Sequence, residues 1–191
     1  GKDSLHNQFT DSETGRVIRI PSTLLISAIG VIDDVRKCVT MDLKNPREGR
    51  LLLISPRGNS LADRIATHRA VSSVIRRGMV LSCHDVSEGG YLTAVAEMCI
   101  ASGLGADLAP DDAEVLFAEP VGQYVIEVEA VGQSEVTRLI AQLGGEVREL
   151  GRTSSDVRLQ IARLLPDRSQ TMDLHVLVDD MTRAWRGTLD W

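Results

Sequence analysis

Apolar runs alternate with amphipathic segments along this chain, and the alternation predicts an α/β fold. Short runs of apolar and β-branched residues are typical of strands, and continuous runs are typical of strands covered on both faces. Such runs predict strands at residues 16–20, 22–32, 51–55, 79–83, 115–119, 123–129, 146–154 and 157–163. The run 22–32 is expected to form a central strand, and residues 33–46 a short helical turn followed by an extended piece.

Apolar residues that recur about every three to four positions predict helices. Segments with this spacing lie around residues 61–75, 92–100, 131–143 and 174–185. Strands and helices in this order favour a mixed sheet with helices on its faces, a three-layer α/β/α arrangement. We expect residues 1–20 to be the remnant of a preceding domain or connection, and residues 21–191 to form one C-terminal domain.

The amino-acid composition limits the kinds of molecule that this protein is expected to bind. The chain has 43% hydrophobic and 25% charged residues, and no apolar run approaches the ~20 residues of a membrane-spanning helix, so we expect a soluble protein that does not bind membranes. A net charge of −6 and 3% aromatic residues argue against nucleic acid as a partner. Three cysteines without CxxC spacing indicate a reducing, cytoplasmic setting. A small charged metabolite is the better partner.

The stretch SCHDVSEGGYLTAVAEM, residues 82–98, places a polar run between a predicted strand and a predicted helix. The first N–H groups of a helix lack partners within the helix and attract phosphate. Gly89 and Gly90 would allow an anion to approach the backbone, and Ser87 would add a hydroxyl donor. Asp85 and Glu88 would repel a bare phosphate, which points to Mg²⁺ with Asp85 as its ligand.

A purely structural interpretation of the same turn stays open. Asp85 would then cap the helix, Glu88 would complete an arrangement like a capping box, and the glycines would only permit a tight turn. His84 would either orient a ligand or form structural hydrogen bonds. Cys83 ends an apolar strand, where thiols are commonly inert, and Glu119 would either reach a ligand or simply belong to a turn.

Several motifs together resemble the synthetase half of phosphoribosylformylglycinamidine synthase, in the superfamily of aminoimidazole ribonucleotide synthetase. They cover nearly the whole chain in the expected order. The motifs are GKDSL at residues 1–5, TLLISAIGVIDDVRKCVTMDLK at 23–44, SCHDVSEGGYLTAVAEM at 82–98 and MTRAWRGTL at 181–189.

The resemblance implies the C-terminal α/β domain of the second synthetase half. It also implies an ATP- and Mg²⁺-dependent ligase of purine biosynthesis, which converts formylglycinamide ribonucleotide to the amidine with ammonia from glutamine. Its partners would be upstream synthetase domains and a glutaminase domain or subunit. By the resemblance, Asp85 would bind Mg²⁺, the turn residues would contact nucleotide or phosphate, and the catalytic acid or base would lie outside this chain. The implied nucleotide or phosphate contacts are Lys2, Ser4, His84, Ser87, Gly89 and Gly90.

The chain departs from the family pattern at two places. After residues 51–55 the family carries a longer loop with a Gly-Gly-Ser or Gly-Gly-Thr sequence, whereas only PRGN stands here. Pro120 and Gln123 replace a usual serine and arginine, so contacts from those positions are not carried over.

Two other functions compete with an enzyme fragment. One nucleotide site of this family can be structural, so the chain could be a non-catalytic assembly module. A sister enzyme, such as selenophosphate synthetase or thiamine-phosphate kinase, fits TMDLK and AWRGTL less well. The isolated chain is expected to have no ATPase activity, because half a cleft loses contacts and preorganisation.

Overall fold

The computed structural model of the chain describes residues 8–19, 26–110, 116–164 and 171–187. It divides into two compact units, Gly1–Val35 and Arg36–Trp191. The expected domain boundary after residue 20 stays a prediction.

In the first unit, β1 (Gln8–Thr10) pairs with β2 (Val17–Arg19) in an antiparallel hairpin. The carboxylate of Asp11 closes the turn by accepting hydrogen bonds from the N–H groups of Glu13 at 2.8 Å and Thr14 at 3.2 Å. These bonds, led by the one from Glu13, lower the pKa of Asp11. The predicted strand at 16–20 is therefore confirmed for its described part.

The predicted central strand at 22–32 is wrong for residues 26–32, and residues 22–25 lie outside the described part. Residues 26–32 form no strand, and Ile29 and Val31 are 99% and 98% exposed. An apolar β-branched run becomes a central strand only if strands pair with both of its edges, and no described strand pairs with this one.

The second unit contains a mixed seven-stranded sheet with the order β4-β6-β3-β7-β5-β8-β9. Of the described strand pairs in it, β5–β8 alone is parallel. In sheet order the strands are β4 (Ser82–Asp85), β6 (Tyr124–Glu129), β3 (Gly49–Pro56), β7 (Gly145–Ser154), β5 (Gly105–Leu108), β8 (Arg158–Leu164) and β9 (Thr171–Leu177).

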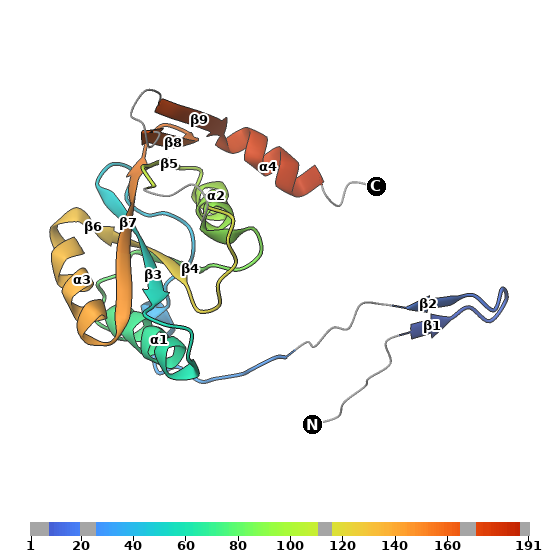
Figure 1. Cartoon of the computed structure of the whole chain (residues 1–191). Helices are drawn as coiled ribbons and strands as arrows, with labels where there is room; N and C mark the ends of the chain where they lie inside the picture. The colour runs from blue at the N-terminus through green and yellow to red at the C-terminus, as the bar shows by residue number, and fades with distance from the viewer. Residues whose placement is uncertain (1–7, 20–25, 111–115, 165–170, 188–191) are drawn as a thin grey trace. The chain divides into compact units, whose positions relative to one another are not determined.

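Helices cover both faces of this sheet, which confirms the three-layer prediction (Figure 1). Side chains alternate along β3, so Leu51 and Leu53 pack on one face and Leu52 and Ile54 on the other. The first face is covered by α2 (Gly90–Ser102) and α4 (Val178–Gly187), and the second by α1 (Leu61–Arg76) and α3 (Gln133–Gln142). Short 3-10 turns lie at Val35–Lys37 and Ala130–Gly132.

Two element predictions in this unit are wrong. Residues 116–119, within the predicted strand 115–119, form a turn and a loop. The last helix begins at Val178, whereas residues 171–177 form β9 because they pair along their whole length with β8. Pairing to a neighbouring strand overrides a helical spacing of apolar residues.

None of the helices in the described part of the chain has the length and apolar character needed to cross a bilayer.

Candidate functional site

The polar run joins an edge strand of the sheet to a helix, as predicted, but the strand lies later than predicted. Residues 79–81 of the predicted strand 79–83 form no strand, and His84 and Asp85 of the polar run belong to the observed strand. β4 ends at Asp85 and α2 begins at Gly90, with Gly89 as the N-cap residue. Both glycines have positive φ, 80° at Gly89 and 73° at Gly90. A Cβ on Gly90 would lie 2.6 Å from the carbonyl oxygen of Leu116, so glycine is required where this neighbouring segment packs against the turn.

Asp85 does not cap the helix, so the capping interpretation is wrong for this residue. No side chain caps α2 at all. Asp85 is the last residue of β4, its side chain is 65% exposed, and it lines a cavity of about 440 Å³. The carboxylate is therefore accessible to a ligand in that cavity.

The backbone amides of both turn glycines are already hydrogen-bonded within the chain. The N–H of Gly89 donates to Oε1 of Glu119 at 2.8 Å, and the N–H of Gly90 donates to the carbonyl oxygen of Ser87 at 3.2 Å. The expected phosphate position at Gly89 is therefore occupied by a carboxylate in this conformation. Glu119 reaches it from the loop before β6.

His84 lies between two carboxylates and is only 15% exposed. Its Nε2 lies 2.9 Å from Oε2 of Glu97, and its Nδ1 lies 3.2 Å from Oδ1 of Asp85. The imidazole is thereby held beside the candidate metal ligand. The sequence analysis did not predict Glu97 as a site residue. Glu97 is the single charged residue of α2, and a lone charge in an otherwise uncharged helix was the signal that could have indicated it.

The cavity beside the turn is acidic. Asp85, Glu88 and Glu119 line it, and its lining contains no lysine or arginine among the described residues. His68 and Tyr124 also line it, and Nδ1 of His68 lies 2.7 Å from the hydroxyl of Tyr124. Burial, followed by the charge of Asp85, raises the pKa of Cys83 to about 12, which opposes formation of the thiolate that a nucleophilic cysteine needs.

These residues fit Mg²⁺ only as a partner of a bound phosphate. The described residues contain no group of three or more His, Cys, Asp or Glu side chains placed to hold a metal ion. Mg²⁺ commonly takes one or two protein carboxylates together with phosphate oxygens and water, and Asp85 meets that requirement. Lys2 and Ser4 lie outside the described residues.

Residues 47–162, more than half of the chain, match the family described as AIR synthase related protein, C-terminal domain. The chain belongs to this family.

The relatives of this AIR synthase related domain are much longer proteins. The phosphoribosylformylglycinamidine synthase subunit PurL of Thermus thermophilus is 31% identical over 158 residues, which cover 71% of this chain and 22% of the relative. PurL of Thermobifida fusca is 29% identical over an alignment of 213 residues, which covers 99% of this chain and 26% of the relative. The chain thus spans about a quarter of the length of these relatives.

Solved structures show the same fold. The crystal structure of phosphoribosylformylglycinamidine synthase II from Thermotoga maritima superposes with a TM-score of 0.66 at 14% identity, covering 78% of this chain and 28% of that one. Escherichia coli HypE, a hydrogenase maturation protein, superposes with a TM-score of 0.55 at 17% identity, covering 72% and 51%.

The two departures from the family pattern have local structural roles. The short loop after β3 leads into α1 through a capping box, in which Ser60 and Asp63 each accept a hydrogen bond from the other's N–H at 3.1 Å. Gln123 donates from Nε2 to Oγ of Ser55 at 2.8 Å, and Pro120 lines the acidic cavity.

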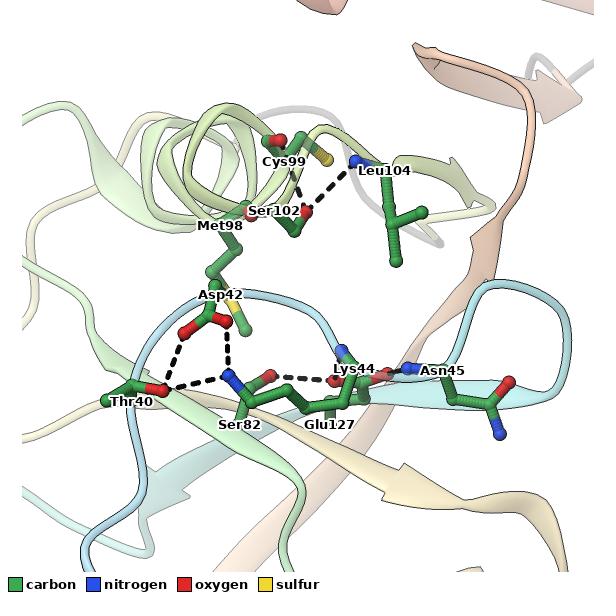
Figure 2. A network of polar contacts seen from close by, with 10 residues as sticks. All are labelled: Thr40, Asp42, Lys44, Asn45, Ser82, Met98, Cys99, Ser102, Leu104 and Glu127. Atoms are coloured by element: carbon green, nitrogen blue, oxygen red, sulfur yellow. Dashed lines mark hydrogen bonds and ion pairs between the residues drawn. The ribbon is translucent and has the colours of Figure 1, made fainter.

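A buried carboxylate anchors the strand that leads to the site (Figure 2). Glu127 is fully buried and accepts hydrogen bonds from the N–H groups of Lys44 and Asn45, each at 2.8 Å, and from the hydroxyl of Ser82 at 2.9 Å. The N–H of Cys83 also donates to the carbonyl oxygen of Thr40 at 3.1 Å. Residues 40–45 are therefore fastened to β4. The glutamate inside the apolar run YVIEVE was the sequence signal for this anchor.

Proposed function

We propose that this chain is part of a phosphoribosylformylglycinamidine synthase. The longer enzyme would be an ATP-dependent carbon–nitrogen ligase that converts formylglycinamide ribonucleotide to the amidine with glutamine-derived ammonia in purine biosynthesis. Membership of the AIR synthase related family and the names of the curated relatives support this proposal. Structures of Thermotoga maritima PurL with ATP and with FGAR support the choice of nucleotide and substrate. The comparisons favour an enzyme fragment over a purely structural module.

The observation that carries the site assignment is the exposed carboxylate of Asp85 in an acidic cavity. The three carboxylates share a lining that holds no lysine or arginine among the described residues, so they repel a nucleotide unless a cation lies between them. Bound Mg²⁺ would supply that charge and neutralise phosphate oxygens during phosphoryl transfer. In this proposal Asp85 holds the cation, and Glu97 fixes the orientation of His84 beside it.

Phosphate contact at the turn requires a rearrangement of Glu119. Its carboxylate accepts the hydrogen bond from Gly89 that a phosphate oxygen would take, so the two anions compete for one N–H group. Ser87 is exposed and lines the same cavity, and in this proposal its hydroxyl donates to the incoming anion. Removal of the charge on Glu119 should therefore strengthen nucleotide binding.

The remaining parts of the enzyme would come from other domains. The chain covers about a quarter of its PurL relatives, so upstream synthetase domains would complete the nucleotide cleft. A structure of PurLQS from Thermotoga maritima supports an assembly with partner subunits. In this proposal one partner is a glutaminase domain or subunit. We expect no ATPase activity from residues 1–191 alone, and turnover that depends on Asp85 in this fragment would contradict that expectation. A cytoplasmic location remains a prediction.

The proposal is tested by isothermal titration of Mg·ATP into the full-length synthase. Asp85→Asn should weaken binding by about tenfold or more, because it removes one charge-assisted metal contact worth about 1.4 kcal/mol or more. Glu135→Gln, an exposed residue on α3, is the control with the same change of charge. Glu119→Gln should tighten binding. Equal affinity and turnover in the Asp85 and Glu135 variants would remove Asp85 from the site.

A further inference from the structure

A second cavity of about 460 Å³ lies against the face of the sheet that carries α2. Arg148 of β7 and Leu53 of β3, which face each other across the two strands, contribute to its wall. Tyr91, directly after the glycine turn, forms another part. Among the described residues, the two cavities have Pro120 and Gln123 in common, and the volume of the second cavity suits a small metabolite.

Arg148 is the cation of this second cavity. Its guanidinium carbon lies 5.5 Å from the ring centroid of Tyr91, which is 1% exposed. This cation–π contact holds the side chain in place without using its N–H donors. Within the described part of the chain, the guanidinium of Arg148 forms no hydrogen bond and no ion pair. A partly buried arginine normally directs its donors at an anion, so these donors are available for one from outside the chain.

Ser55 adds a second donor. Its Oγ accepts a hydrogen bond from Nε2 of Gln123 at 2.8 Å. Because the Ser55 oxygen accepts this bond, the Ser55 hydroxyl keeps its own hydrogen for donation to a ligand. Ser55 and Gln123 both line the cavity. The Arg148 guanidinium and the Ser55 hydroxyl thus border the same cavity.

One feature of the cavity opposes an anion. Glu146 lies two residues from Arg148 on β7, so both side chains are on the same face, and Glu146 also lines the cavity. Its carboxylate is exposed and forms no ion pair with Arg148. Glu146 would repel an anion bound at Arg148. Substitution of Glu146 is therefore a second, independent way to change the charge of the site and test its effect on binding.

We propose that this second cavity binds the oxyanion group of a small metabolite, a phosphate monoester or a carboxylate, through Arg148 and Ser55. A guanidinium matches both groups because it can donate two parallel N–H bonds to two oxygens. The proposal concerns residues separate from Asp85 and the glycine turn. It can therefore hold whether or not the turn binds Mg·ATP.

The test uses the full 191-residue chain, with inorganic phosphate and acetate as separate probes. Titrations are followed by NMR of the arginine Nε–Hε signals in ¹⁵N-labelled protein. Saturable shifts are expected at Arg148. Arg148→Gln keeps much of the side-chain stem over Tyr91 and should weaken binding by about tenfold, and Arg148→Lys should weaken it by a smaller factor because lysine lacks the planar fork. Glu146→Gln should strengthen binding.

The matched control is Arg138→Gln, which removes the same charge from an exposed position on α3, the opposite face of the sheet. If Arg138→Gln and Arg148→Gln weaken binding equally, the attraction is only general electrostatics and the proposal is overturned. An absence of saturable shifts with both probes also overturns it. Tighter binding of phosphate supports a phosphate monoester, and tighter binding of acetate supports a carboxylate. Circular dichroism checks folding, and Arg148→Lys keeps the test valid should the glutamine variant unfold.

Discussion

Replacement of Glu127 is expected to destabilise the larger unit more than any exposed charge change. Glu127 is fully buried, and its two oxygens accept all three of its described hydrogen bonds. Oε2 accepts from Lys44 N–H and from the Ser82 hydroxyl, and Oε1 accepts from Asn45 N–H. The carboxylate therefore joins two backbone amides of one loop to a neighbouring strand.

The magnitude follows from this geometry. Glutamine has the same shape but one oxygen, so one of the two backbone N–H groups must face the new NH₂ group. Hydrogen bonds to charged groups contribute about 1.5–3 kcal/mol each, and removal of the charge relieves part of its desolvation. We expect Glu127→Gln to lower the free energy of unfolding by about 2 kcal/mol. Glu127→Ala removes all three bonds and leaves a cavity, so we expect a loss of about 4 kcal/mol.

Urea unfolding followed by circular dichroism measures both losses in the 191-residue chain. The control is Glu129→Gln, two residues further along the same strand, whose exposed carboxylate accepts one bond from Nδ2 of Asn45 at 2.9 Å. This control should change stability by less than about 0.5 kcal/mol. Hydrogen exchange provides a local measure, because the amides of Lys44 and Asn45 should lose protection in the Glu127 variants.

Two results would refute the reasoning. A Glu127→Ala variant as stable as the Glu129 control would show that the buried bonds contribute no net stability. Unchanged exchange at Lys44 and Asn45 would show that the loop is held by other contacts.

Three further outcomes are expected. Gly90→Ala should lower the free energy of unfolding by about 2–4 kcal/mol in urea titrations, because the residue has a φ of 73° and its Cβ would meet a backbone oxygen at 2.6 Å. A thiol reagent at pH 8 should label exposed Cys38 within minutes and the partly buried Cys83 much more slowly, since burial raises the pKa of Cys83 to about 12; equal rates would contradict this. The hydrogen bond from Lys44, followed by that from Thr40, lowers the pKa of Asp42, so its contribution to stability is present above pH ~3.8 and lost as pH falls through the lowered pKa. Lys44→Met should move the pKa of Asp42 back toward 3.8 in an NMR titration.

The sequence determined those strands and helices whose buried residues recur at a regular spacing along the chain. The continuous apolar run at residues 51–55 predicted a strand covered on both faces, and β3 has that position. The turn between a strand and a helix within residues 82–98 was also predicted, because glycines mark the turn and an apolar stripe marks the helix.

Sheet pairing limited what local patterns could predict. Residues 26–32 have the composition of a strand but no described strand partner, and residues 171–177 have helical spacing but pair with β8. Strand order is a long-range property, so apolar spacing alone could not decide either segment.

The chemistry of the sites was decided by the tertiary structure. The residue types in the sequence indicated that Asp85 and the glycines could bind a ligand. They did not indicate that Glu119, 30 residues beyond Gly89, would accept the hydrogen bond from the N–H of Gly89. Nor did they indicate that Glu127 would accept a bond from an amide 83 residues away, or that Arg148 would lie over Tyr91. Periodicity along the chain encodes which face a residue occupies, whereas the partner of a polar group depends on which strands and loops the fold brings beside it.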